Sequence, residues 1–454
     1  MSKKRKEKNI LKASKYNIIF EHDGKILAFN SFTTSLAEVD SDFLRLLENI
    51  EKSDVDNLNE KDTELLEQMK RGNFVIDDEV NELDLLKVSS FTSKCRNQHF
   101  AFTVALTLQC NFDCPYCYQN RQVGKISKDV REAIYKRIES EAALKHDISI
   151  TWYGGEPLLA KDILEEMANK IIDICDKAGV RYSSSMITNG YLVDKDTIEL
   201  LKRIKIKSVQ VTIDGPPDIH NARRRTFDHS VKTFDKIIEN IKLLCDNDIS
   251  VNIRVNIDKG NKNELERLLK ILAENGLQKC SISLGQVKDY TAACSSIAHT
   301  CLSGKEYADE SLKDQEMLLK YGFSAKSFPY YPGIKSNYCC ADAISSYVVD
   351  PEGNLYKCWN DTGVVERSVG NIKDDKIKYN KIYLDYLLWS PFDYEKCREC
   401  KCLPLCMGGC PYEGLKLGKP ECEKWIYNLK EVLKMRYDIN CAEEQKATQN
   451  GATS

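Results

Sequence analysis

The middle of the chain repeats one pattern, in which a short apolar run is followed by a longer segment with apolar residues at helical spacing. The short runs predict strands at 102–108, 148–153, 184–188, 208–213, 251–257 and 280–284. The longer segments predict helices at 128–144, 161–177, 195–203, 231–245 and 262–274. Apolar strands that alternate with amphipathic helices are typical of a parallel sheet covered by helices. We therefore expect an α/β fold in which residues 101–320 form a partial (β/α)6 barrel, with its chemistry at the carboxyl ends of the strands.

The first 85 residues show a different pattern, and we expect them to form a separate module. Alternating runs at 16–21 and 25–30 flank a turn and predict paired strands. A helix that is capped by Ser41 or Asp42 and a second helix at 61–69 precede a short strand at 73–77. This content predicts either a winged-helix-like module with a strand edge for an extended peptide, or a structural cap on the next domain.

The segments outside these two units have no clear period. Residues 86–100 are expected to be a linker, because the stretch from 77 to 100 is acidic and then polar. The lysine-rich start of the chain is expected to be a solvated tail. A helix is expected at 424–441, and the polar residues 441–454 are expected to be disordered.

Composition narrows the class of protein. A net charge of −3 over 454 residues gives no general signal for nucleic acid or for a membrane surface. The sequence has no run of about 18 apolar residues and no secretory signal, so we expect a cytoplasmic protein without a membrane span. Nineteen cysteines are an odd number, so they cannot all be paired. Twelve of them lie in two tight clusters, three at 110–117 and nine at 339–422, which favours metal ligation over cystine.

The first cluster, Cys110, Cys114 and Cys117, follows the first predicted strand of the barrel. Three thiolates this close cannot all form unstrained disulfides, but they can converge on one soft metal centre. Zinc would need a fourth ligand, and the loop contains no further cysteine or histidine. A four-iron cubane with three cysteines leaves one iron open to a small ligand. The spacing C-x3-C-x-aromatic-C, with Tyr116 as the aromatic residue, resembles the signature of the radical S-adenosylmethionine (SAM) enzymes.

The later strand ends carry segments that also resemble this family. G-G-E-P at 154–157 resembles the segment that holds the amino group of SAM, since its glycines allow close approach and Glu156 offers an acceptor. Each turn segment alone is equally an ordinary loop end, and Arg254 could equally satisfy hydrogen bonds in the core. For Arg223–Arg225 we expect a solvated basic loop, with contact to substrate as the alternative. The resemblance implies that the residues contacting SAM or substrate are Tyr116, Gly154, Gly155, Glu156, Pro157, Thr188, Asn189, Asp214 and Arg254.

The second cluster has the order C … G-x4-C … C-x2-C-x5-C-x3-C … C, which resembles the SPASM domain of radical SAM maturases. We expect this domain at 321–440. In the family seven such cysteines hold two auxiliary iron–sulfur clusters. The resemblance assigns one cluster to four residues, Cys397, Cys400, Cys406 and Cys422. It assigns the other to Cys340 or Cys339 with Cys358 and Cys410. The fourth ligand of that cluster stays open between a spare thiol, Cys339 or Cys402, and substrate sulfur.

The resemblance implies three [4Fe–4S] clusters, SAM, and a flavodoxin or ferredoxin as electron donor. In the family SAM is split to a 5′-deoxyadenosyl radical, which removes hydrogen from the substrate, and the auxiliary clusters accept the remaining electron. Sulfatase-maturing members carry Asp directly after the G-x4-C cysteine, where this chain has Trp359, and the nearest acid is Asp361. We therefore expect oxidative modification of a ribosomally made precursor peptide that has a leader and is rich in cysteine.

The expected product is a thioether that joins a cysteine sulfur of the peptide to a carbon. Carbon–carbon or carbon–oxygen crosslinking is an alternative, and so is anaerobic sulfatase maturation. The cysteines would also suit a protein of another class, either a non-catalytic iron–sulfur electron carrier or a metal-stabilised peptide-binding scaffold. The G-G-E-P segment and the three-cysteine loop with its open iron position argue against both.

Overall fold

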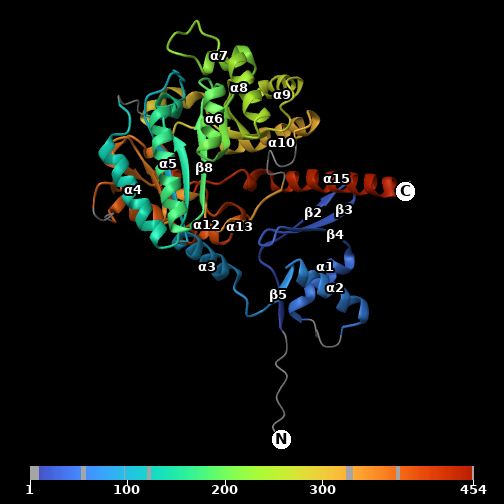
Figure 1. The fold of residues 1–454 in the computed structure, drawn as a ribbon. Coiled ribbons are helices and arrows are strands. Elements are labelled where there is room, and N and C mark those ends of the chain that lie inside the picture. Colours follow the sequence, from blue (N-terminus) through green and yellow to red (C-terminus); the bar gives the residue numbers. More distant parts are fainter. Residues whose placement is uncertain are drawn as a thin grey trace.

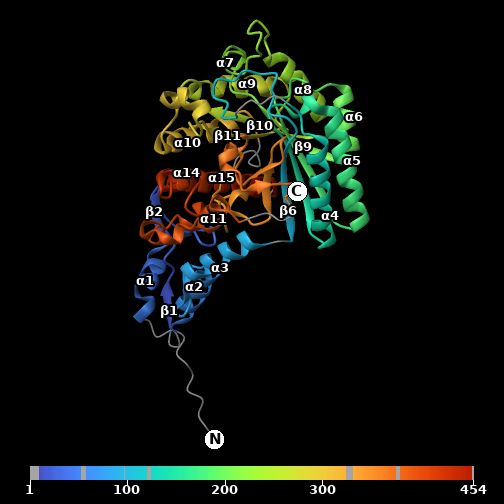
Figure 2. The same ribbon diagram turned by 90° about the vertical axis from the view of Figure 1, so that its left-hand side faces the viewer.

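The computed structural model describes residues 10–52, 58–96, 98–119, 124–323, 331–374 and 379–451, so the predicted tail at the start of the chain lies outside the described residues. The molecule is built on a nine-stranded sheet of order β11-β10-β9-β8-β7-β6-β12-β13-β14 (Figures 1 and 2). A smaller unit made from the first part of the chain lies to one side of this sheet, and the two are joined through α3 (Figure 1). Among the described residues, no helix combines the length and apolar character that crossing a bilayer requires.

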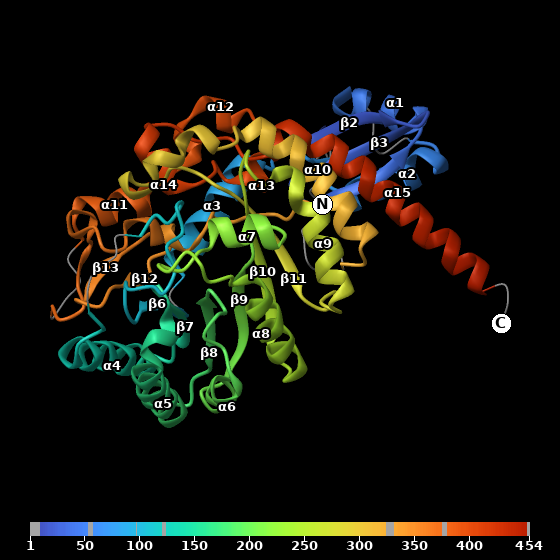
Figure 3. The same ribbon diagram turned by 90° about the horizontal axis from the view of Figure 1, so that it is seen from above.

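Six consecutive parallel strands confirm the predicted barrel sheet. They are β6 (His99–Ala105), β7 (Asp147–Tyr153), β8 (Tyr182–Thr188), β9 (Ile206–Thr212), β10 (Ser250–Ile257) and β11 (Ser281–Gln286). Helices cover their outer face (Figure 3): α4 (Lys128–Ala143), α5 (Lys161–Ala178), α6 (Lys195–Arg203), α8 (Phe234–Asp246) and α9 (Leu265–Glu274). Because β6 ends at Ala105, Cys110 follows the strand by five residues rather than the two expected.

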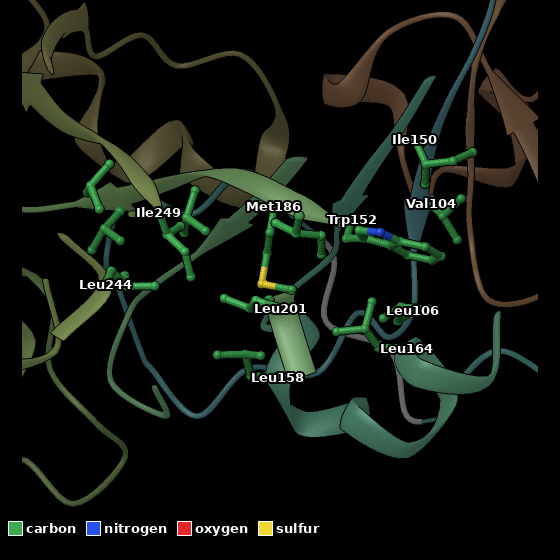
Figure 4. Close-up of a cluster of buried hydrophobic side chains, with 14 of the residues drawn as sticks. Val104, Leu106, Ile150, Trp152, Leu158, Leu164, Met186, Leu201, Leu244 and Ile249 are labelled. Atoms are coloured by element: carbon green, nitrogen blue, oxygen red, sulfur yellow. The ribbon is translucent and has the colours of Figure 1, made fainter. Parts of the chain in front are cut away.

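The core of the barrel lies between the sheet and these helices. Figure 4 shows Met186 of β8 and Trp152 of β7 among leucines of the covering segments, such as Leu164 of α5 and Leu201 of α6. All four side chains are almost completely buried. Full burial of a side chain of this size contributes roughly 1.5–3 kcal/mol, so the alternation of strand and helix is held by packing on the outer face of the sheet.

The C-terminal cysteine region adds strands to the barrel sheet, which was not predicted. β12 (Ser346–Val349) pairs in parallel with β6, and β13 (Asn354–Tyr356) and β14 (Gly370–Asn371) follow it in antiparallel order. Without β12, β6 would be an open edge of the sheet. The β12–β13 hairpin also brings Cys358, two residues beyond β13, to the side of the barrel.

The first part of the chain forms two small antiparallel sheets and three helices. β1 (Leu11–Ala13) pairs with β5 (Val75–Asp77), and β2 (Asn17–His22), β3 (Lys25–Asn30) and β4 (Ser35–Val39) form a meander. The helices are α1 (Ser41–Asn49), α2 (Glu60–Arg71) and α3 (Glu82–Cys95). The expected caps of the first helix were wrong: the side chain of Asp40 accepts from the Phe43 N–H, because Asp40 is the last residue in extended conformation.

Two expectations for irregular segments were also wrong. The predicted linker contains most of α3, which begins after the capping side chain of Asn81. The helical pattern of apolar and polar residues in α3 is weak, because Leu85, Val88 and Phe91 are exposed whereas Lys94 is buried. The predicted disordered tail continues α15 (Trp425–Gly451), because alanine, glutamate, glutamine and lysine are good helix formers even without an apolar face. Residues 452–454 lie outside the described residues.

Of the remaining helices, α7 lies between β9 and α8, α10 follows the last barrel strand, and four short helices lie in the C-terminal region. They are α7 (Pro217–Arg223), α10 (Gly304–Lys320), α11 (Lys381–Leu388), α12 (Glu395–Arg398), α13 (Leu403–Cys406) and α14 (Pro411–Leu417). α10 packs against α15, so the last helix of the chain is attached to the barrel side of the molecule.

Candidate active site

A cavity of about 390 Å³ lies at the carboxyl ends of the barrel strands. The loop after β6 contributes Cys110, Cys114 and Cys117 to its wall, and Trp359 and Asn360 come from the C-terminal region. The predicted residues that line it are the three cysteines, Tyr116, Gly154, Gly155, Thr188, Asn189 and Arg254. The structure places the other three predicted residues, Glu156, Pro157 and Asp214, behind this wall.

The two glycines after β7 hold the start of the cysteine loop. The Gly155 N–H donates to the carbonyl of Thr107 at 2.9 Å, and the Glu156 N–H donates to the carbonyl of Gln109 at the same distance. A Cβ on Gly154 would lie 2.2 Å from the Thr107 oxygen, and one on Gly155 would lie 2.1 Å from the Gln109 oxygen. Glycine is therefore required here by the approach of the cysteine loop, in addition to any approach of a ligand.

Glu156 is fully buried and connects three strand-end loops. Its carboxylate accepts from the Thr188 hydroxyl at 2.7 Å and from the Asn189 N–H at 2.7 Å. The Asn189 side chain then donates to Asn111 Oδ1, inside the cysteine loop, at 2.7 Å. Burial raises the pKa of Glu156, while these hydrogen bonds oppose the shift. The carboxylate thus positions Asn189 and the loop, and its role as an ammonium acceptor stays a prediction.

Tyr116 anchors the other end of the cysteine loop to the fourth and fifth strands of the barrel. Its hydroxyl donates to the Asp214 carboxylate and accepts from Arg224 Nη1 at 2.8 Å. Asp214 also accepts from the Asn256 N–H at 3.0 Å. Burial raises the pKa of Tyr116 well above its ordinary value, although the charge of Arg224 opposes the shift. The phenol is therefore a neutral hydrogen-bonding group that fixes the segment between Cys114 and Cys117.

The three arginines at the end of α7 contact the cysteine loop, so the expectation of a solvated loop was wrong. The Arg223 guanidinium lies 5.1 Å from the centre of the Tyr116 ring and donates to Asp258 at 2.7 Å. Arg225 accepts from the Asp113 N–H at 2.7 Å through its carbonyl. The sequence offers one signal for this role, three consecutive cations that follow the fourth predicted strand. Their partners come from distant parts of the sequence.

Arg254 lies at the boundary between two cavities. Its guanidinium fills the space above Gly285 of β11, where a Cβ would lie 1.6 Å from Nη2. Its Nε donates to Asn256 Oδ1 at 3.1 Å. A second cavity, of about 650 Å³, adjoins the first and shares Arg254, Gln286, Lys288 and Tyr290 with it. Because Cys410 and Cys422 also line the second cavity, a ligand there can reach both the barrel and the C-terminal cysteines.

Four C-terminal cysteines surround one small cavity. They are Cys397, Cys400, Cys406 and Cys422, the same four that the sequence assigns to one auxiliary cluster. A close approach of two backbone segments brings them together, since a Cβ on Gly409 would lie 2.1 Å from the Glu421 oxygen. Cys402 lines the same cavity, and its thiol donates to the Trp425 carbonyl at 3.6 Å. Cys402 is thus beside this set of thiols and not beside Cys358.

Cys358 lies close to Cys339 and Cys410. Burial raises the pKa of Cys358 well above its ordinary value, and the other two thiolates raise it further. The Cys340 thiol is in a different environment, because Lys357 and Ser346 lower its pKa while burial raises it. Cys339 and Cys410 are thus among the charged groups that act on the Cys358 thiol, which favours Cys339 over Cys340 as their partner.

Trp359 closes the first cavity on the side of the C-terminal region. Its ring centre lies 5.2 Å from that of Tyr153, whose hydroxyl is hydrogen-bonded to Tyr118. Asp361 is almost completely buried, where it accepts from Arg367 Nε at 2.9 Å and from the Tyr386 hydroxyl at 2.8 Å. Among the described residues that line the first cavity, none is an aspartate or a glutamate.

The donor set of this cavity fits an iron–sulfur cluster with an open coordination position. Three half-buried thiols face one space at Cys110, Cys114 and Cys117, and the polar atoms of the neighbouring strand ends line the rest of it. Thiolates are the ligands that such clusters require, and three of them leave one iron of a cubane free.

Sequence comparisons agree with this fit. Residues 104–282, from β6 to β11, match the radical SAM superfamily. The cysteine-type anaerobic sulfatase-maturating enzyme of Clostridium perfringens is 26% identical over 341 residues, which cover 66% of this chain and 85% of that enzyme. The antilisterial bacteriocin subtilosin biosynthesis protein AlbA of Bacillus subtilis is 26% identical over 334 residues, which cover 70% of this chain and 68% of AlbA.

Solved structures show the same fold. The sulfatase-maturating enzyme anSMEcpe, with bound AdoMet and the Cp18Cys peptide, matches with a TM-score of 0.56 and 20% identity over 75% of this chain and 99% of its own. SuiB of Streptococcus suis, bound to the precursor peptide SuiA, matches with a TM-score of 0.53 and 14% identity over 91% of this chain and 99% of its own. The chain thus contains a radical SAM domain and is similar to peptide-modifying and sulfatase-maturating enzymes, which supports a radical SAM enzyme and implies SAM and a [4Fe–4S] cluster as its cofactors.

Proposed function

We propose that this enzyme modifies a ribosomally made precursor peptide and joins a cysteine sulfur of the peptide to one of its carbons. The observation that carries the proposal is the wall of the first cavity at Trp359, because this wall offers an indole and no carboxylate base. A reaction that removes hydrogen from carbon and closes a ring with the peptide's own sulfur needs no carboxylate at that position. The adjoining second cavity has room for a peptide segment.

The residues of the chain have separate tasks in this proposal. Cys110, Cys114 and Cys117 would hold the cluster that, with SAM, would supply the 5′-deoxyadenosyl radical. The glycine turn and the Asn189–Asn111 hydrogen bond keep that loop in place. Trp359 and Tyr153 restrict water at the far wall, which protects a reactive radical from quenching. Arg254 and Asn256 provide the polar side of the cavity for the carboxylate or ribose of SAM.

Two further clusters would give the enzyme three in total. Cys397, Cys400, Cys406 and Cys422 would hold one [4Fe–4S] cluster with a complete set of thiolates. Cys339, Cys358 and Cys410 would hold the other, and the position of Cys340 beside Lys357 favours Cys339 as the ligand. A three-thiolate site leaves one iron for substrate sulfur, which suits thioether formation. A flavodoxin or ferredoxin would exchange electrons with the enzyme.

The N-terminal module is proposed to bind the leader of the peptide as a winged-helix-like recognition element. The meander of β2, β3 and β4 offers a strand edge on which an extended peptide can add a strand. The likeness to anSMEcpe covers 75% of this chain, whereas the likeness to SuiB, solved with its precursor peptide, covers 91%. The additional coverage supports a role of this module in peptide binding.

The test is anaerobic co-expression with a short cysteine-rich peptide encoded beside the enzyme, followed by mass spectrometry. The expected product has lost two hydrogens per ring, and one cysteine per ring resists alkylation. The matched control replaces all three cysteines of the loop, Cys110, Cys114 and Cys117, by alanine and should leave the peptide unchanged. A product that has lost two hydrogens while every thiol remains alkylatable would indicate carbon–carbon or carbon–oxygen crosslinking instead.

Sulfatase maturation is a second candidate, and the relatives from Clostridium perfringens favour it. Against it stand Trp359 and the burial of Asp361 between Arg367 and Tyr386, which keeps that carboxylate away from the cavity. A sulfatase-derived peptide with a cysteine target distinguishes the two candidates. Formation of a formylglycine aldehyde, detected with a hydrazide, together with an unmodified precursor peptide, would favour this candidate over crosslinking.

A further inference from the structure

Two cysteines that belong to neither cysteine cluster lie in contact at the amino ends of the barrel strands, opposite the active-site cavity. Cys245 is in the last turn of α8, and Cys280 directly precedes β11. Their Sγ atoms are 3.4 Å apart. A disulfide bond needs about 2.05 Å between its sulfurs, so a further approach of about 1.4 Å would close the pair.

Polar contacts beside the sulfurs hold the two segments together. Lys279 Nζ lies 3.2 Å from Asp246 Oδ1. One turn earlier on α8, Lys242 Nζ donates to Asn275 Oδ1 at 2.7 Å. β10 pairs with β11 and also contacts α8. The end of α8 is thus fixed against the segment that leads into β11, which keeps the two sulfurs close without a bond between them.

The two thiols differ in exposure and in charge. Cys245 is half-buried, whereas Cys280 is 1% exposed. A hydrogen bond from the Cys280 thiol and the charge of Lys279 lower the pKa of Cys245, although burial opposes the shift. The same hydrogen bond, together with burial, raises the pKa of Cys280. Cys245 is therefore the nucleophile that a small reagent can reach, and Cys280 is the thiol that reacts second.

We propose that Cys245 and Cys280 form a thiol–disulfide exchange site that takes a small disulfide, such as glutathione disulfide, as its oxidant. The Cys245 thiolate attacks one sulfur of the small disulfide, and the first small thiol leaves with a proton. Cys280 then loses its proton and attacks the Cys245 sulfur of the mixed disulfide, which releases the second small thiol. The chain gives up two electrons and two protons, and the small disulfide takes up both.

The closed pair fixes a helix that supports the active site from behind. At the start of α8, Thr233 Oγ1 donates to the Arg224 carbonyl at 3.0 Å. In the middle of α8, Asn240 Nδ2 donates to the Gly190 carbonyl at 2.8 Å. Both acceptors lie in segments that contact the cysteine loop. The ring closed by the bond spans residues 245–280, so the bond should stabilise the barrel by restricting its unfolded chain.

The test incubates the reconstituted full-length enzyme with an excess of glutathione disulfide under anaerobic conditions. Free thiols are then alkylated, and the digested chain is mapped by mass spectrometry. The expected product is a pair of peptides joined through Cys245 and Cys280, two hydrogens lighter than the two reduced peptides. The midpoint of thermal unfolding should rise by about 5 °C, and dithiothreitol should reverse this rise.

Single substitutions separate the two steps of the exchange. Cys280→Ala should stop at a mixed disulfide on Cys245, whereas Cys245→Ala should leave Cys280 unmodified because Cys280 is buried. Neither variant should show the rise in the midpoint. The matched control is Cys175→Ala, which removes another buried thiol of the barrel, on α5, and should keep both the cross-link and the rise.

Two results would overturn the proposal. One is a wild-type chain in which both thiols are still alkylated after the incubation, and the other is a mixed disulfide that persists on Cys245 while Cys280 stays reduced. Both are read from the wild-type chain, so they decide the question even where Cys280→Ala fails to fold. Neither depends on the peptide substrate or on auxiliary iron, so the exchange site and the proposed function stand or fall separately.

Discussion

The loop with Cys110, Cys114 and Cys117 and the cysteine region after Cys339 hold their thiols by different means. The loop is fixed from outside, by Gly155, Asn189 and residues after α7 that belong to other parts of the barrel. The C-terminal cysteines lie on short helices and tight turns, and residues between or next to them make long-range polar contacts, such as Lys401 to the Asn17 carbonyl and Lys335 to Glu423. The two sets of thiols are therefore held by different neighbours, and each can be disturbed without the other.

The strongest test of this difference replaces a glycine in the barrel. Gly154→Ala would place a Cβ 2.2 Å from the Thr107 oxygen at a φ of +132°, so the cysteine loop must move. We expect formation of 5′-deoxyadenosine to fall at least about 100-fold, since displacements near 1 Å have effects of this size. About four of about twelve irons per chain should be lost, one cubane's share.

The control for this change is Gly276→Ala, which also has a positive φ, of +72°, but has open space at its Cβ position. It should cost about 1 kcal/mol of stability and leave iron content and 5′-deoxyadenosine formation unchanged. Equal activities in the two variants would mean that the glycine turn does not hold the cysteine loop.

The corresponding change in the C-terminal region is Gly409→Ala, whose Cβ would lie 2.1 Å from the Glu421 oxygen. Because this contact joins the segments of Cys406, Cys410 and Cys422, auxiliary iron should be lost. SAM cleavage should continue without formation of the modified peptide, as judged by chromatography and mass spectrometry of one reaction. Gly418→Ala, with a φ of +67° and open space, is the control in the same region. Loss of SAM cleavage in Gly409→Ala alone would show that the two regions are not independent.

A smaller effect is expected from Arg224→Met. The substitution removes the donor to the Tyr116 hydroxyl at 2.8 Å but keeps most of the buried volume. Loss of a buried hydrogen bond to a charged group is worth about 1.5–3 kcal/mol, so we expect a roughly tenfold to hundredfold slower formation of 5′-deoxyadenosine. Arg203→Met on α6, where the side chain is 56% exposed, should have no effect. An unchanged rate in Arg224→Met would mean that the hydrogen bond from Arg224 to Tyr116 does not help to position the cysteine loop.

The smallest effect concerns the contact between α10 and α15, which joins the two regions. Burial raises the pKa of Asp314 to about 7. Between about pH 4 and pH 7 the folded chain therefore binds more protons than the unfolded chain, and stability falls as pH rises through this window. Asp314→Asn should flatten this slope in chemical unfolding, by up to about 4 kcal/mol over the window. The exposed Asp309→Asn should keep the slope, and a flat wild-type profile would contradict the prediction.

The sequence was most informative where one physical pattern dominates. The barrel strands alternate buried apolar residues with less buried ones and are followed by amphipathic helices, so the repeat of strand and helix stands out. The cysteine spacings identify the thiol sets without any knowledge of the fold. The roles of Arg223, Arg224 and Arg225 could not be predicted, because their partners Asp258, Tyr116 and Asp113 are distant in sequence. Glu156 shows the same limit, since its acceptor atoms are used by Thr188 and Asn189.

Two segments show why the spacing of apolar residues does not predict all of the secondary structure. α3 exposes Leu85, Val88 and Phe91, so it lacks the amphipathic pattern by which a helix is recognised. β12 has an ordinary apolar sequence, but its partner β6 lies more than 240 residues earlier. A parallel pairing over this distance depends on the completed barrel, so the local sequence around β12 cannot predict it.

The pairing of β12 with β6 also sets how this protein can be divided or recombined. A boundary at 320 and 321 separates the cysteine motifs but cuts a continuous sheet, since residues 346–349 complete the edge that residues 101–104 offer. A barrel expressed alone would present that edge to other chains and invite aggregation. The smallest unit that can be exchanged between maturases therefore includes the β12–β13 hairpin, so that Cys358 and Trp359 travel with the barrel.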